Sequence, residues 1–225
     1  MSGPTTDRSK SSVVIFASGR GTNLRAICEA VEVGKISARV EAVVSNVPGS
    51  GACEIAREFR IPTIEIDSKG KTREAHEALV LAALEGVSPD WLVLAGYMRL
   101  LSPAFIQKYW DDSLSAARIV NIHPSLLPAF PGVEGYAQAI RYGVKVTGAT
   151  VHLVTYGLDD GPIIAQKSLE VSARETAESL TARGLLLEHS LYVNALADLL
   201  SGNWQVSRGA DADGRPRIVF NQEAG

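Results

Sequence analysis

An unbroken run of β-branched and aromatic side chains at residues 12–17 most constrains what this chain can fold into. The sequence Ser-Val-Val-Ile-Phe-Ala lacks the alternation of apolar and polar residues that marks a half-exposed strand. It is typical of a strand buried on both faces of a parallel sheet. After a glycine loop at residues 18–21, apolar residues return at helical spacing, at Leu24, Ile27, Cys28 and Val31. The sequence therefore predicts a first βα unit, with its strand near the centre of the sheet.

The same alternation of strand and helix patterns continues along the chain. Strands are predicted at residues 40–45, 63–66, 91–95 and 118–120, and helices at residues 52–59, 72–85 and from Pro103 onward. Two extended stretches, at residues 147–154 and 163–166, then lie close enough to pair antiparallel, and a long amphipathic helix follows from Ala177 to Leu199. We expect an α/β fold: a single mostly parallel, open twisted sheet with helices on both faces and an antiparallel pair near its C-terminal part.

The length of 225 residues suits one sizeable domain. We expect residues 1–11 to be a disordered polar tail, residues 12–202 to form the main domain and residues 203–225 to be a C-terminal extension. A small hairpin joining residues 204–206 to residues 218–220 is expected within that extension, around the turn-forming residues 210–216.

Composition argues against several classes of function. The net charge of −3 argues against a nucleic-acid surface, and no apolar run approaches the roughly 20 residues that cross a bilayer. The first ten residues lack the apolar core of a signal peptide, so we expect a cytoplasmic protein. Cys28 and Cys53 are expected to pack in helices without a disulfide. Apart from His123, which follows a predicted strand, His76 is expected on a helix surface, His152 inside a strand and His189 on the last helix. No two of them share metal-ligand spacing, so we predict no metal site.

The eight residues 121–128, Asn-Ile-His-Pro-Ser-Leu-Leu-Pro, follow a predicted strand and carry the strongest indication of chemistry. Because side chains alternate faces along an extended backbone, Asn121 and His123 point the same way. An amide donor beside an imidazole can polarise a carbonyl and manage protons at one centre, and the two prolines stiffen the loop that holds them. The alternatives are a histidine satisfied within a proline-rich turn and an asparagine that only ties off the loop backbone. We interpret the segment as one wall of an active site.

The loop at residues 19–23, Gly-Arg-Gly-Thr-Asn, joins a buried strand to the N-terminus of a helix. Unpaired backbone N–H groups and the helix dipole favour an anion there, so a phosphate would fit. The loop lacks the third glycine of a dinucleotide fingerprint and the Gly-Lys-Ser of a Walker A loop. The alternative is a tight turn in which Thr22 or Asn23 caps the helix.

The turn at residues 157–162, Gly-Leu-Asp-Asp-Gly-Pro, offers two carboxylates between the two antiparallel stretches. Solvated turn residues are the alternative interpretation. An imidazole used for proton transfer needs a carboxylate to fix its tautomer and stabilise its cation, and this turn lies between strands expected beside His123. Either Asp159 or Asp160 is therefore a candidate partner.

Four segments, in this order, resemble the phosphoribosylglycinamide formyltransferase family, also called the GAR transformylases. The resemblance covers approximately residues 13–200 and rests on residues 18–24, on residues 94–105, on residues 121–128 with Phe-Pro-Gly at 130–132, and on residues 148–166. It implies that residues 12–202 form a formyltransferase catalytic domain. The implied reaction transfers a formyl group from the co-substrate 10-formyltetrahydrofolate to the glycinamide amine of 5'-phosphoribosylglycinamide, in de novo purine biosynthesis.

The resemblance also implies a role for each site residue. Asn121 and protonated His123 would stabilise the oxyanion, and Asp159 would keep His123 cationic, with Asp160 as a variable neighbour. Gly21, Thr22 and Asn23 would hold the substrate phosphate and Glu188 would contact the ribose. The folate would lie against Arg73, Met98, Arg99, Leu100 and Leu101, with Asn121 at its reactive end.

Two stretches depart from the family pattern beside these loops. Residues 133–136, Val-Glu-Gly-Tyr, stand where the family often carries one or two histidines, and Thr155-Tyr156 replaces a more usual acidic pair before Gly157. Substrate contacts and folate affinity are the properties that these changes would alter.

Two competing interpretations remain. One is another enzyme that uses 10-formyltetrahydrofolate, namely a tRNA or amino-sugar formyltransferase or a hydrolase; the other is a non-catalytic nucleotide-binding module that uses the glycine loop alone. The tRNA enzyme needs a basic carboxy-terminal domain and the hydrolase an amino-terminal regulatory domain, and we expect 225 residues to have room for neither. The expected partners are the two small-molecule substrates, for a monomer or homodimer with no nucleic acid and no membrane.

Overall fold

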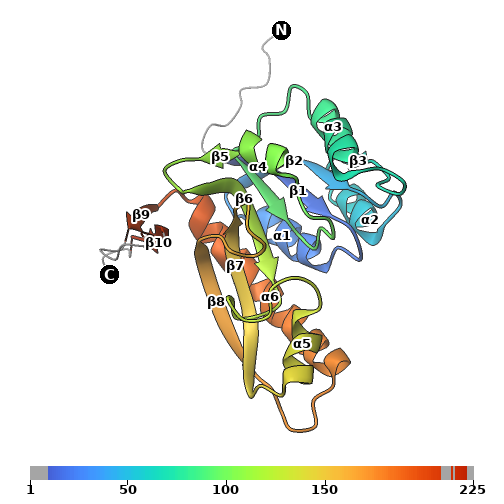
Figure 1. The fold of residues 1–225 in the computed structure, drawn as a ribbon. Helices are drawn as coiled ribbons and strands as arrows, with labels where there is room; N and C mark the ends of the chain where they lie inside the picture. The colour runs from blue at the N-terminus through green and yellow to red at the C-terminus, as the bar shows by residue number, and fades with distance from the viewer. Residues whose placement is uncertain (1–9, 209–213, 215, 222–225) are drawn as a thin grey trace.

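Strands and helices alternate from Ser11 onward in the computed structural model, which describes residues 10–208, 214 and 216–221 (Figure 1). The first part of the chain forms β1 (Ser11–Ala17), α1 (Thr22–Glu32), β2 (Ala38–Ser45), α2 (Gly51–Glu58), β3 (Thr63–Glu65), α3 (Arg73–Ala83), β4 (Trp91–Leu94) and α4 (Pro103–Lys108). The second part forms β5 (Trp110–Asp111), β6 (Ala116–His123), α5 (Gly135–Tyr142), β7 (Val146–Val154), β8 (Ile163–Glu170), α6 (Ala177–Leu200), β9 (Trp204–Arg208) and β10 (Pro216–Phe220). The predicted order is confirmed, and β5 and α5 are additions that the sequence patterns did not predict.

A mixed sheet carries the fold, with strand order β3-β2-β1-β4-β6-β7-β8 and the short β5 paired to β6. Neighbours from β3 to β6 are parallel, whereas β7 runs antiparallel to both β6 and β8. The predicted fold class is therefore confirmed, and β9 and β10 form the expected separate hairpin. β6 is longer than the predicted strand at residues 118–120, because pairing with β7 continues to His123 opposite Thr150.

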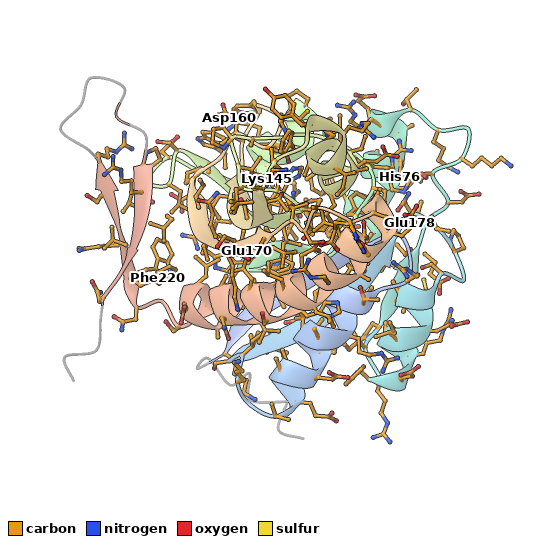
Figure 2. All side chains as sticks on the ribbon, turned by 90° about the horizontal axis from the view of Figure 1, so that it is seen from below. His76, Lys145, Asp160, Glu170, Glu178 and Phe220 are labelled. Atoms are coloured by element: carbon orange, nitrogen blue, oxygen red, sulfur yellow. The ribbon has the colours of Figure 1, made fainter. Side chains whose placement is uncertain are left out.

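Helices cover both faces of the sheet, and the side chains of β1 alternate between the two cores. Val13 and Ile15 pack with α1, α2 and α6, whereas Val14 and Phe16 pack with α3 and α4. Figure 2 shows α6 lying beside α1 across one face, with Glu178 near one end of α6 and the hairpin that carries Phe220 near the other end. The hairpin is anchored to α6 by Trp204, whose indole N–H donates to the carbonyl oxygen of Leu199 at 2.7 Å.

Tyr192 joins α6 to the two strands that lie under the candidate site. Its side chain is fully buried, and its hydroxyl oxygen lies 3.1 Å from the carbonyl oxygens of both Leu94, in β4, and Val120, in β6. The hydroxyl therefore supplies a donor to carbonyls at the carboxyl ends of neighbouring parallel strands. This contact fixes the long helix relative to the strand that carries Asn121 and His123.

Several smaller expectations can be compared with the structure. Cys28 and Cys53 are buried free thiols in α1 and α2, as expected. Residues 1–9 of the expected tail lie outside the described residues, and Ser11 pairs with Ala38 in β2. Most of the turn expected at residues 210–216 also lies outside the described residues. Among the described residues, none of the helices combines the length and the apolar character needed to cross a bilayer.

The expectation that His76 lies on a helix surface is wrong. Its side chain is fully buried on α3, and its Nε2 lies 2.9 Å from the carbonyl oxygen of Ile66. The chain leaving β3 passes over this part of α3 and covers the imidazole. Helical periodicity alone does not reveal such a covering segment, because it describes one element and not its neighbours.

Candidate active site

Asn121 and His123 lie on the same face of β6, two residues apart at its carboxyl end, as predicted. Asn121 is opposite Leu94 of β4 on one side and opposite His152 of β7 on the other. Strand pairing on both sides therefore fixes the backbone of Asn121. His123, the last residue of β6, is buried.

His123 has an acceptor beside each ring nitrogen. Its Nε2 lies 2.7 Å from the carbonyl oxygen of Phe130, and its Nδ1 lies 3.3 Å from Oδ2 of Asp159. A carbonyl oxygen only accepts, so Nε2 carries a hydrogen, and a proton on Nδ1 completes an ion pair with the carboxylate. The second distance is longer than a typical N–H···O hydrogen bond, so the contact with Asp159 is mainly electrostatic, and a bound oxygen in the plane of the ring can share the Nδ1 hydrogen. The ring orientation thus depends on the backbone of Phe130 as well as on the expected carboxylate.

Asp159 reaches the site because the loop between β7 and β8 folds back over the sheet. β7 is antiparallel to β6, and its last residue, Val154, is opposite Ala117 near the start of β6. The loop that carries Asp159 therefore leaves an antiparallel strand, unlike the glycine loop and the segment after β4, which follow parallel strands. Asp159 adopts φ 51°, in the left-handed region, and its Oδ2 accepts the backbone N–H of Gly132 at 2.7 Å. Of the two candidate aspartates, Asp159 is the one whose carboxylate faces His123.

His152 belongs to this cluster and was not selected from the sequence. Its Nδ1 lies 2.9 Å from the carbonyl oxygen of Leu153, and its Nε2 lies 3.2 Å from Nδ2 of Asn121. Burial lowers the pKa of His152 below the ordinary histidine value, which favours the neutral ring. With Nδ1 donating to the carbonyl, Nε2 accepts one hydrogen of the Asn121 amide and leaves the second hydrogen for a ligand. The register of two antiparallel strands is the signal that would have identified it.

The glycine loop presents a helix start that has no side-chain cap. Gly21 is the N-cap of α1 at φ 74°, and neither Thr22 nor Asn23 caps the helix, so that alternative interpretation is wrong. A Cβ at Gly21 would lie 2.8 Å from Cα of Ala52 and 2.9 Å from Cδ1 of Ile55, so α2 packs directly against the loop. The first backbone N–H groups of α1 therefore remain available to an anion.

Asn23 and Glu188 meet beside this loop. The Nδ2 of Asn23 donates to Oε2 of Glu188 at 3.0 Å, and the hydroxyl of Tyr136 donates to Oε1 of Glu188 at 3.0 Å. All three side chains are buried. Burial raises the pKa of Glu188, while the two donated hydrogen bonds act in the opposite direction. Glu188 is therefore a buried carboxyl group oriented by two donors.

The segment after β4 carries four of the candidate folate residues, Met98 to Leu101. Met98 and Leu100 expose 74% and 58% of their surface, and both line the cavity described below. The backbone N–H of Met98 donates to Oγ of Ser18 at 2.8 Å, so this segment is tied to the residue that directly follows β1. Arg99 reaches the carbonyl oxygen of Ser68 at 3.4 Å.

One cavity of about 1070 Å³ unites these groups. Every site residue selected from the sequence lines it: Gly21, Thr22, Asn23, Arg73, Met98, Arg99, Leu100, Leu101, Asn121, His123, Asp159 and Glu188. His152 and Tyr136, which were not selected, line it too. Among the described residues, no group of His, Cys, Asp and Glu side chains could hold a metal ion. The arrangement combines hydrogen-bond donors at one centre with an anion site and an apolar wall.

Comparison with known proteins gives a consistent result. Residues 11–196 match the family model described as formyl transferase. The chain is 39% identical to the phosphoribosylglycinamide formyltransferase of Bacillus subtilis (strain 168) over 190 residues, 84% of this chain and 94% of that protein. It is 42% identical to the enzyme of that name from Mycobacterium tuberculosis (strain H37Rv) over 188 residues, 83% of this chain and 84% of that protein.

A solved structure extends the similarity to nearly the whole chain. The crystal structure of glycinamide ribonucleotide transformylase 1 from Symbiobacterium toebii superposes with a TM-score of 0.84 at 36% identity, covering 98% of this chain and 99% of that one. The chain belongs to the formyl transferase family, and within it to the phosphoribosylglycinamide formyltransferases.

Proposed function

We propose that this protein transfers the formyl group of 10-formyltetrahydrofolate to the amine of 5'-phosphoribosylglycinamide, a step of de novo purine biosynthesis. The observation that carries the proposal is the meeting of Asn121, His123 and Asp159 in one cavity with an uncapped helix start. The cavity volume of about 1070 Å³ is at the upper end of the range for small-molecule sites, which suits two substrates. The relatives named above support the same substrates.

The reaction is direct acyl transfer. The substrate amine attacks the formyl carbon, a C–N bond forms, and the carbonyl oxygen becomes an oxyanion. The bond from that carbon to N10 of the folate then breaks, and the proton lost by the amine is transferred to N10. The protein needs to hold two substrates in line and to stabilise the oxyanion, and no covalent intermediate with the protein is required.

Asn121 and His123 supply the oxyanion donors in this proposal. One Asn121 amide hydrogen is directed to His152, and the other remains for the formyl oxygen. The Nδ1 hydrogen of His123 is the second donor, and Asp159 stabilises the positive charge on that ring from 3.3 Å. His152 is a positioning residue, because it acts on the substrate through the orientation of the Asn121 amide.

The two substrates bind on either side of these donors. The backbone N–H groups at Gly21, Thr22 and Asn23 hold the phosphate, and Glu188 accepts hydrogen bonds from the ribose hydroxyls. The folate binds against Arg73 and the segment from Met98 to Leu101, with its formyl group toward Asn121. We also propose that the protein is cytoplasmic, that residues 12–202 form its catalytic domain, and that it acts as a monomer or a homodimer.

An assay with both substrates tests the proposal. Loss of the formyl group from 10-formyltetrahydrofolate is followed with and without the phosphoribosyl amine. Formyl loss that requires the amine supports the transferase, whereas loss without it supports a hydrolase and contradicts the proposal. A formyl-methionyl-tRNA or formyl-amino-sugar product in parallel reactions would favour the other formyl transferases.

Variants test the roles of the residues. Asn121→Ala and His123→Ala are each expected to lower turnover about 10² to 10³-fold, the usual effect of removing one oxyanion donor. Asp159→Asn is expected to lower it by a similar factor, because the neutral amide no longer stabilises the charged ring. Asp160→Asn, in the same turn, is the matched control and is expected to keep most of the activity. Wild-type turnover in both alanine variants would refute the assignment.

A further inference from the structure

Tyr136 occupies a place in the site that the reaction described above does not use. It is the second residue of α5, exposes only 4% of its surface, and lines the cavity. It is also one of the residues at which this sequence departs from the family pattern. Its hydroxyl donates to Oε1 of Glu188 at 3.0 Å.

Gly184 makes room for the ring of Tyr136. A Cβ built on Gly184 would lie 2.1 Å from Cζ and 2.4 Å from the hydroxyl oxygen of Tyr136. Glycine within a helix destabilises it by about 1 kcal/mol relative to alanine, and Gly184 lies well inside α6. The phenol ring explains the glycine, because it fills the volume that any other side chain would need.

Two hydrogen bonds hold the carboxyl group of Glu188, which also lines the cavity. Oε1 accepts the Tyr136 hydroxyl and Oε2 accepts the Asn23 amide, so each oxygen keeps lone pairs for a further donor. Oδ1 of Asn23 is also buried and has no partner among the described residues. Because Glu188 lines the cavity, its two carboxyl oxygens are the acceptors available there to a ligand that brings hydroxyl donors.

We infer that Tyr136, seated against Gly184, is a positioning residue that holds the Glu188 carboxylate in the orientation that accepts the ribose hydroxyls of the substrate. The inference rests on the proposed role of Glu188 and adds the residues that make that role possible. Without the Tyr136 hydroxyl, one oxygen of Glu188 loses its donor and the side chain can rotate away from the ligand. A buried carboxylate that loses a hydrogen-bond donor also becomes costly to keep charged.

Removal of one oxygen tests the inference. Tyr136→Phe keeps the ring against Gly184 and deletes only the hydroxyl. We expect the Kd for phosphoribosylglycinamide to rise about 10-fold, and the Kd for the folate to stay within about 2-fold of wild type. Tyr142→Phe, on the same helix and 80% exposed, is the matched control and is expected to leave both Kd values unchanged.

A substrate analogue distinguishes the loss of an oriented Glu188 carboxylate from a general loss of substrate binding. The ratio of Kd values for the 2'-deoxyribosyl and ribosyl substrates measures how well the site reads the hydroxyl. We expect this ratio to be large in the wild type and to fall at least about 5-fold in Tyr136→Phe, since the oriented acceptor is lost. A variant that binds both substrates more weakly by the same factor, with an unchanged ratio, would overturn the inference.

Gly184→Ala is a second way to remove the hydrogen bond from Tyr136 to Glu188. The new methyl group displaces the phenol, so we expect a lower Tm and the same fall in the ratio. In the double variant Tyr136→Val with Gly184→Ala, the smaller side chain makes room for the methyl group, and we expect Tm to recover while the ratio stays low. Recovery of both properties would show that the hydroxyl has no positioning role.

Glu188→Gln distinguishes a failure of this inference from a failure of the proposed ribose contact. If Glu188→Gln and Tyr136→Phe both lose the preference for the ribosyl substrate, the inference is supported. If Glu188→Gln loses it and Tyr136→Phe keeps it, the inference is refuted while the ribose role of Glu188 stands. If Glu188→Gln keeps it, the ribose role itself is wrong and the inference falls with it.

Discussion

Replacement of Gly135 by alanine is expected to disturb catalysis through a single steric contact. Gly135 is the first residue of α5, and its backbone lies outside the left-handed region, so alanine can adopt its conformation without strain. A Cβ at this position would nevertheless lie 2.4 Å from the carbonyl oxygen and 3.0 Å from the carbonyl carbon of Pro124. Pro124 directly follows His123, so α5 packs against the backbone next to the proposed oxyanion donor.

The size of the effect follows from this geometry. Real Cβ atoms essentially never approach other heavy atoms closer than 3.0 Å, so the helix and the loop must separate by at least about 0.6 Å. Overpacking of this kind costs about 1 to 3 kcal/mol of folding stability. A displacement approaching 1 Å at a catalytic group can lower turnover about 10²-fold. We expect Gly135→Ala to lower kcat about 10- to 100-fold and also to lower Tm.

The assay is formyl transfer with both substrates at saturating concentration, together with a thermal melt. Gly143→Ala is the matched control: Gly143 ends the same helix at φ 78°, and no atom lies within 4 Å of its Cβ position. That variant is expected to lose about 1 kcal/mol of stability from backbone strain while keeping its kcat. If Gly135→Ala keeps wild-type kcat, or if Gly143→Ala loses as much, the contact with Pro124 does not position His123.

Further predictions concern stability and reactivity. Because burial raises the pKa of Glu188, its contribution to stability is fully present below the unfolded pKa and is lost as the pH rises through the folded pKa. Glu188→Gln should therefore be more stable than wild type at pH 7, with a smaller gain at pH 4, and urea denaturation that shows no such difference would contradict this sign. Tyr192→Phe should lower the free energy of unfolding by about 1 to 3 kcal/mol in urea titrations, because it removes the donor to two buried carbonyls, and a change under 0.5 kcal/mol would argue against that role. Burial raises the pKa of Cys28 to about 12, so its alkylation by iodoacetamide at pH 8 should be slow in the folded protein and fast after denaturation; equal rates in both states would contradict it.

The sequence alone predicts that Asn121 and His123 share one face of a strand, but it does not locate the residues that contact them. The period of two along a strand brings the amide and the imidazole to one face, whatever the rest of the fold does. The choice between Asp159 and Asp160 depends on how the loop folds back from β7, with Asp159 at φ 51°. No local pattern encodes that path, so the residues alone left both aspartates open and only the family resemblance favoured Asp159.

The contributions of His152 and Tyr136 depend on contacts between elements. His152 becomes significant only when β7 pairs with β6 in the register that sets it opposite Asn121. Tyr136 lies in α5, a short helix that the sequence patterns did not predict, and it reaches Glu188 only because α5 packs on α6 beside Gly184. Both residues look ordinary in sequence, one in a strand and the other after a loop, because their partners are distant along the chain.

The position of β6 explains why one cavity can serve two substrates. β6 has a parallel neighbour, β4, on one side and an antiparallel neighbour, β7, on the other. The parallel half supplies the glycine loop and the segment after β4, which are suited to a phosphate and to an apolar ring system. The antiparallel half supplies His152 directly and Asp159 through the loop that folds back. Because Asn121 and His123 lie on the strand where the two halves join, the acceptor amine and the formyl donor can both reach these two side chains.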